Sequence, residues 1–161
     1  MSALRERNLR STKPLPDEVV FHEPRSGKSA TALRLLGALA VVVVGSVHLE
    51  QYFGVHYDVV PIIGPLFALN FAGATLIGLG LLLPAVRMRV LHILFALGGI
   101  GLAATSFVFL FVSESRPLFG FEEYGYRPVI IVALVAEAAA VVLLGAYLAS
   151  EAGAGRGTGR S

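Results

Sequence analysis

Four long apolar stretches divide the chain, and short polar or turn-forming segments separate them. A membrane-spanning helix needs about 20 mostly apolar residues. The pattern predicts spans over about residues 30–52, 61–83, 90–112 and 128–149. Pro61 and Pro128 suit the first turn of a helix, where the N–H that proline lacks is not needed. The sequence therefore predicts an all-α fold, a polytopic four-transmembrane-helix bundle over residues 30–149.

The segments outside the spans have a different composition. Residues 1–29 contain three prolines and mixed charges, which is typical of a disordered segment, and we expect a basic cytoplasmic arm there. Residues 150–161 are rich in glycine and predict a flexible cytoplasmic tail.

Composition and charge limit the classes of function that this chain can have. The 161 residues are 55% hydrophobic and only 15% charged, against about 25% charged in an ordinary soluble domain. The chain has no cysteine, which excludes disulfides, thiolate metal sites and cysteine nucleophiles. Its pI of about 9.2 comes from basic residues that cluster at one end and beside the apolar stretches. This placement indicates membrane topology and argues against a nucleic-acid partner.

The lysines and arginines also predict the orientation. Eleven of the thirteen lie in the N-terminal region, in the connection after the second span or in the C-terminal tail. By the positive-inside rule, both termini are cytoplasmic. Four of the five tyrosines flank the opposite ends of the spans, where an aromatic belt would lie.

Polar residues inside the spans are the first candidate site. Counted at 1.5 Å per residue from the outer ends, Glu137 lies about 14 Å deep, Asn70 at a similar depth, and Thr105 and Ser106 about 10 Å deep. His48 lies near the outer end of the first span. All four spans thus contribute polar groups to the outer half of the bilayer.

Two interpretations of these groups remain open. Small residues beside Glu137 indicate that it faces the bundle interior, because such residues let another helix approach closely. Glu137 and Asn70 then form either interhelical hydrogen bonds that specify packing, or a ligand-binding or proton-titrating site with Ser106, Thr105 and His48.

A second candidate is the segment "VHLEQYFGVHYD", which contains His48, Glu50, His56 and Asp58. Imidazole and carboxylate groups together suit Zn²⁺ or Cu²⁺, although the spacing matches no established ligand pattern. The alternative is that His48 packs at the membrane interface and the other three residues lie in a solvated loop.

The stretches "HLEQYFGVHYDVVPIIGPLFALN" and "LFGFEEYGYRPVIIVALVAEAAAVVLL" resemble small four-span membrane proteins of high-GC actinobacteria. The likeness covers most of residues 45–145. It implies a bacterial plasma membrane, and it implies no activity.

The chain contains no nucleophile elbow, phosphate loop, dinucleotide fingerprint or zinc-protease motif, which favours a non-enzymatic role and leaves a membrane enzyme that uses the polar groups as the third hypothesis. The first functional hypothesis is a non-enzymatic accessory or interaction subunit of a membrane complex. Its partner, a membrane protein or a second copy of the chain, would contact the arm and the aromatic segment "RPLFGFEEYGYRP". The alternative is a small-ligand-binding or proton-coupled protein that uses Glu137. The sequence does not identify a cofactor.

Overall fold

The computed structural model describes residues 26–84, 88–117, 119 and 127–157. In these residues the chain forms α1 (Ser26–Gly54), the short 3-10 helix η1 (Tyr57–Val59), α2 (Ile63–Leu82), α3 (Arg89–Ser115) and α4 (Pro128–Gly157). Each of the four α-helices is long and apolar enough to cross a membrane. The described part is therefore all-helical, with the architecture of a multi-pass membrane protein, which confirms the predicted fold at that level.

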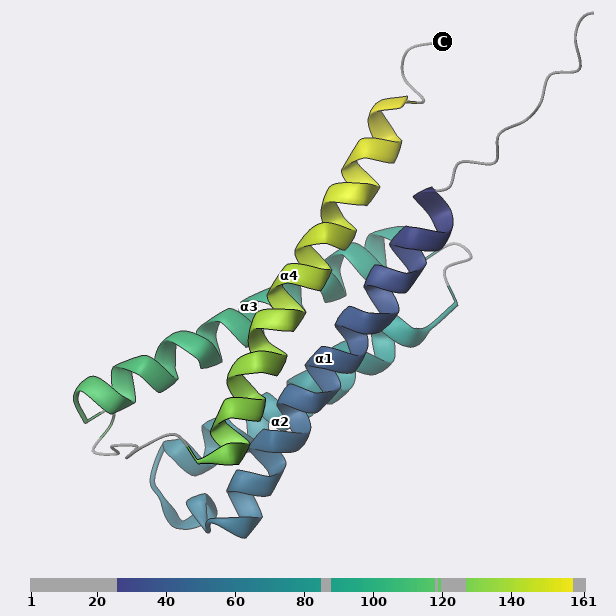
Figure 1. Cartoon of the computed structure of the whole chain (residues 1–161). Coiled ribbons are helices and arrows are strands. Elements are labelled where there is room, and N and C mark those ends of the chain that lie inside the picture. The colour runs from purple at the N-terminus through teal and green to yellow at the C-terminus, as the bar shows by residue number, and fades with distance from the viewer. Residues whose placement is uncertain (1–25, 85–87, 118, 120–126, 158–161) are drawn as a thin grey trace, which may run out of the picture.

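Consecutive helices run in opposite directions (Figure 1). The start of α1, the end of α2, the start of α3 and the end of α4 consequently lie at one end of the bundle. We call it the Arg34 end, because Arg34 of α1 contacts the end of α2 there. The opposite end holds η1, and we call it the Tyr57 end. In Figure 1 the second half of α3 diverges from α1 and α4 towards the Tyr57 end.

Several helix ends differ from the predicted spans by one to eight residues, among them the starts of α1 and α2 and the end of α4. α1 begins at Ser26, inside the segment predicted as a disordered arm, while residues 1–25 lie outside the described residues. α4 continues to Gly157, where a flexible tail was expected from residue 150; residues 158–161 are not described. α2 begins at Ile63, because Pro61 and Ile62 form a turn in which the Ile63 N–H donates to the Pro61 carbonyl.

The extension of α4 has a local cause. Arg89 at the start of α3 donates from Nε to the Glu151 carboxylate at 2.6 Å and from its second terminal nitrogen to the Glu151 backbone carbonyl at 2.8 Å. Alanines around Glu151 also favour helix. The last turns of α4 are therefore held against α3.

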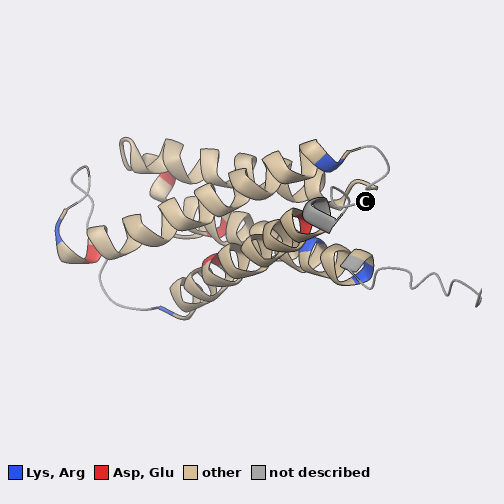
Figure 2. Cartoon of the chain, turned by 90° about the horizontal axis from the view of Figure 1, so that it is seen from above, with Lys and Arg blue, Asp and Glu red and all other residues tan. Residues whose placement is uncertain are grey.

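The outer surface of the bundle is apolar. Large aliphatic side chains from all four helices are exposed along their lengths; examples are Leu39, Leu76, Leu94, Val135 and Val142. Figure 2 shows most charged residues near the helix ends, with the lengths between them mainly uncharged. A large exposed apolar surface is costly in water, so this surface fits contact with lipid.

The tight core lies in the Arg34 half of the bundle. It is built mainly from small residues, including the fully buried Ala38, Ala96 and Ala140, together with Val41 and Leu144. Small residues bring helix backbones close together in membranes, where packing replaces the hydrophobic effect as a driving force. Such close packing fixes the positions of the helices in this half.

Gly99 of α3 shows how close this packing is. A Cβ atom at Gly99 would lie 2.8 Å from Leu144 Cδ1 and 3.2 Å from Val41 Cγ2. A side chain at this position would therefore push α3 away from α1 and α4, and glycine is what allows the three helices to meet.

Arg34 joins α1 to α2 at its own end of the bundle. Its side chain is only 5% exposed, and its Nη1 donates to the backbone carbonyls of Leu81 and, at 2.9 Å, Leu83. The last carbonyls of a helix have no partners within the helix. A cation at that position satisfies them and interacts favourably with the negative end of the helix dipole. The buried His92 of α3 lies 3.2 Å from the same nitrogen.

Candidate functional site: a cavity between the helices

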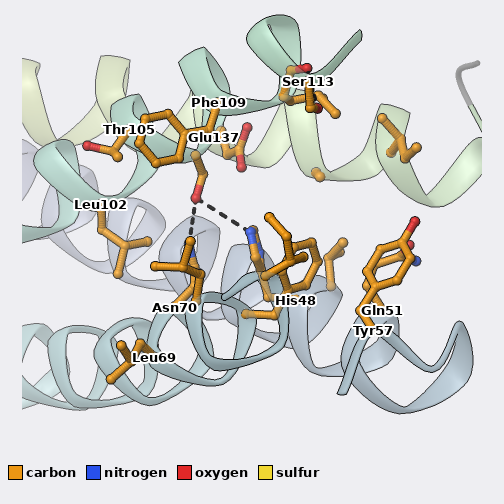
Figure 3. Close-up of a pocket in the computed structure, with 18 of the residues that line it drawn as sticks. His48, Gln51, Tyr57, Leu69, Asn70, Leu102, Thr105, Phe109, Ser113 and Glu137 are labelled. Atoms are coloured by element: carbon orange, nitrogen blue, oxygen red, sulfur yellow. Dashed lines mark hydrogen bonds between the residues drawn. The ribbon is translucent and has the colours of Figure 1, made fainter. Parts of the chain in front are cut away.

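A cavity of about 430 Å³ lies in the Tyr57 half of the bundle. All four α-helices and η1 contribute to its wall (Figure 3). Its lining is mostly apolar, with eight side chains that carry hydrogen-bonding groups: His48, Gln51, Tyr57, Asn70, Thr105, Ser106, Ser113 and Glu137. The five residues predicted as a ligand or proton site are all in this set.

Glu137 is placed in the cavity wall by the inner face of α4. Ile130, Ala133 and Glu137 follow one another at spacings of three and four residues, which puts them on the same helix face, and all three line the cavity. Glu137 is 2% exposed, and Ala133, Ala136 and Ala140 around it are buried. The carboxyl group therefore faces the bundle interior, as its small neighbours indicate.

A chain of hydrogen bonds joins α1, α2 and α3 at the cavity. Asn70 Nδ2 donates to Ser106 Oγ at 2.5 Å, and Ser106 Oγ lies 3.4 Å from His48 Nε2. The two dashed lines in Figure 3 mark these contacts. His48 Nδ1 lies 2.9 Å from the Val44 carbonyl, which can only accept, so Nδ1 carries the hydrogen. The Nε2 atom of the neutral ring then accepts from the Ser106 hydroxyl.

This arrangement leaves two acceptors unpaired. Glu137 Oε2 and Asn70 Oδ1 are buried, and neither has a hydrogen-bond partner among the described residues. Leaving a buried polar atom unpaired costs about 1–3 kcal/mol. If Glu137 only tied helices together, its carboxyl would bond to an amide or hydroxyl across the interface. The structure instead pairs Asn70 with Ser106 and leaves Glu137 Oε2 unbonded.

Aromatic rings support the polar chain on the side nearer η1. Phe67 of α2 contacts the His48 ring, with centroids 4.9 Å apart, and the Tyr57 ring edge-to-face at 5.3 Å. Arg127, just before α4, donates to Gln51 Oε1 at 2.9 Å and to the Tyr57 hydroxyl at 3.0 Å. We call Arg127, Gln51 and Tyr57 the arginine clamp. It links α1, η1 and the start of α4 at the Tyr57 end of the cavity.

Three of the eight polar cavity residues are not predicted from the sequence: Gln51, Tyr57 and Ser113. Gln51 follows His48 by three residues, and Ser113 follows Ser106 by seven, so helical spacing places each on the face of a predicted residue. Tyr57 is one of the four tyrosines that the sequence predicts at the ends of the spans, and its side chain lines the cavity. His56 before it has a left-handed backbone, with φ of 60°, which turns the chain at that point.

The predicted metal ligands do not come together. His48 lines the cavity, whereas Glu50 is exposed on α1 and accepts a hydrogen bond from Gln51. His56 Nδ1 lies 3.9 Å from Asp58 Oδ1, in the connection to α2. In the described residues no three His, Asp or Glu side chains are grouped to hold a metal ion. Glu122 and Glu123 of the aromatic segment, whose carboxylates could supply further ligands, lie outside the described residues.

No model of a known protein family, no curated protein and no solved structure matches this chain. The chemistry of the cavity is therefore the basis on which a function is assigned.

Proposed function

We propose that this small integral membrane protein binds a lipophilic small molecule in the cavity around Glu137. The observation that carries the proposal is the buried Glu137 Oε2, which lies in a cavity wall without a hydrogen-bond partner in the described residues. Ligand sites are typically concave, mostly apolar and about 300–1,000 Å³, with a few convergent polar groups. An ionisable residue inside a membrane span is by default a candidate functional residue.

The orientation and location belong to the same proposal. The distribution of basic residues supports cytoplasmic termini, and the resemblance to actinobacterial proteins supports a bacterial plasma membrane. In that orientation the cavity lies in the outer half of the bilayer. Binding is proposed because the lining is mostly apolar with a few convergent polar groups, as in ligand sites.

The accessory-subunit hypothesis stays a prediction. It rests on the N-terminal arm and on the aromatic segment between α3 and α4, and residues 1–25 and 120–126 are not among the described residues. Association with a second copy or another membrane protein likewise stays a prediction.

The proposal requires that small molecules in the bilayer reach Glu137. A lipophilic carbodiimide, dicyclohexylcarbodiimide, tests this because it partitions into bilayers and adds to protonated carboxyl groups. We expect it to label Glu137 in protein reconstituted in liposomes, at some pH between about 5 and 8. Peptide mass spectrometry would locate one added reagent mass on the α4 peptide. Glu137→Gln should abolish this labelling, and Glu50→Gln, which changes an exposed carboxyl outside the cavity, should leave it unchanged.

Folded protein that shows no labelling of Glu137 at any pH in this range would contradict the proposal. In that case the carboxyl would be sealed inside the bundle, and a packing role would explain it better.

A further inference from the structure

The opening of the cavity lies in the side of the bundle, between α2 and α3. The exposed lining residues are on these two helices: Leu69 is 67% exposed, Phe109 is 41% exposed, and Gly101 and Thr105 are also exposed. Lining residues from α1 and α4 are buried or half-buried. The exposed positions fall well inside the two helices, at membrane depth, so the opening faces lipid.

The route along the bundle axis is obstructed at the Tyr57 end. The arginine clamp crosses it, and Gln51 within the clamp is only 4% exposed. Phe67 packs beneath Tyr57 on the same side. In the other direction, the tight small-residue core of the Arg34 half closes the bundle. The side opening between α2 and α3 is therefore a less obstructed path to Glu137 than the bundle axis.

The polar end of the cavity needs hydrogen-bond donors. Asn70 Oδ1 is an acceptor, and a carboxyl group offers at most one hydrogen for its two oxygens. A ligand that carries a hydroxyl, amine or guanidinium group can satisfy both residues. An ether or ester, which only accepts, leaves Asn70 Oδ1 unpaired.

We infer that the ligand is a single-chain amphiphile with a hydrogen-bond-donating head, which enters sideways from the bilayer between α2 and α3. This inference rests on the proposed function. The head binds beside Glu137 and Asn70, and the chain leaves past Leu69, Leu102 and Phe109 into lipid. A cavity of about 430 Å³ is at the small end of the range for ligand sites, which suits a head group and the first part of one chain.

Three probes with the same alkyl chain test the donor requirement: 1-dodecanol, dodecylguanidinium and dodecyl methyl ether. Each is added at the same mole fraction of lipid before carbodiimide labelling of the reconstituted full chain. We expect at least one donor probe to slow labelling of Glu137 five-fold or more, and the ether to have less than a two-fold effect. Protection by the guanidinium alone identifies a cationic ligand, and protection by the alcohol alone identifies a neutral one.

The side entry is tested with two glycine substitutions. A Cβ atom at Gly101 or at Gly145 would meet nothing within 4 Å, so both helices accept a side chain there. Of these two, only Gly101 lines the cavity. Gly101→Leu should slow carbodiimide labelling of Glu137 at least five-fold, because the reagent and the ligand enter by the same opening, whereas Gly145→Leu should be labelled as fast as wild type.

The outcomes separate this inference from the proposed function. If Glu137 is labelled but the ether protects as well as the donors, or none of the three protects, the ligand class is wrong while the cavity remains accessible. If Gly101→Leu is labelled as fast as wild type, the entry route is wrong. Absence of labelling in wild type overturns both the proposed function and this inference.

Discussion

Replacing Arg34 with methionine is expected to destabilise the bundle by about 2 kcal/mol. Methionine retains much of the volume but offers no donor to the carbonyls at the end of α2. The Leu81 carbonyl belongs to a fully buried residue, and an unpaired buried acceptor costs about 1–3 kcal/mol. The Leu83 carbonyl belongs to a residue that is 43% exposed, so water can replace the lost donor there at little cost. The expected loss of about 2 kcal/mol therefore comes mainly from the buried Leu81 carbonyl.

The matched control is Arg89→Gln, which removes the ion pair with Glu151. The Arg89 side chain is 57% exposed, and exposed ion pairs contribute only about 0–1 kcal/mol. Both substitutions remove one positive charge at the same end of the bundle, so general charge effects cancel in the comparison.

Equilibrium unfolding in mixed micelles of a mild detergent and dodecyl sulfate, followed by circular dichroism, measures both variants. A loss of about 2 kcal/mol lowers the folding equilibrium constant by roughly 30-fold. Arg34→Lys keeps a charge and a donor and should lie between wild type and Arg34→Met. If Arg34→Met proves no less stable than Arg89→Gln, Arg34 does not cap α2 and the reasoning fails.

Two further substitutions test the packing and the polar chain. Gly64→Ala should lower the free energy of unfolding by about 1–3 kcal/mol, because its Cβ would lie 2.7 Å from the Tyr57 backbone carbonyl oxygen, which has little room to move. Gly101→Ala has open space around it, so in the same assay it should be neutral or stabilising by up to about 1 kcal/mol. A double-mutant cycle of Asn70→Ala and Ser106→Ala should give a coupling energy of about 0.6 kcal/mol, and at most about 1.7 kcal/mol, as other interhelical hydrogen bonds in membranes do. A coupling energy of zero would show that the bond does not join α2 to α3.

The spans were predictable because an apolar stretch of sufficient length has few alternatives to a membrane helix. The common depth of Glu137, Asn70 and Ser106 was also predictable, because alternating helix direction converts residue number into depth. Which face of each helix contacts its neighbours depends on packing. The sequence does not reveal that face, because the positions around each span are almost uniformly apolar. For Glu137, the small residues beside it were enough to predict that it faces the bundle interior.

The role of Arg34 could not be predicted from local pattern. Next to an apolar stretch, an arginine counts as a topology signal, and its partners on α2 are 47 and 49 residues away in sequence. The inward orientation of Tyr57 could not be predicted for the same reason, because its partner Arg127 is 70 residues away in sequence. Long-range partners of this kind depend on how the helices come together, which the sequence pattern does not encode.

The separation of the tight core from the cavity has a consequence for how this protein can change. The small residues and Arg34 hold the Arg34 half together, and none of them lines the cavity. Substitutions at Leu69, Thr105 or Phe109 therefore alter the lining without touching this core. The wall of the cavity can change its shape and polarity while the close helix contacts of the Arg34 half stay the same.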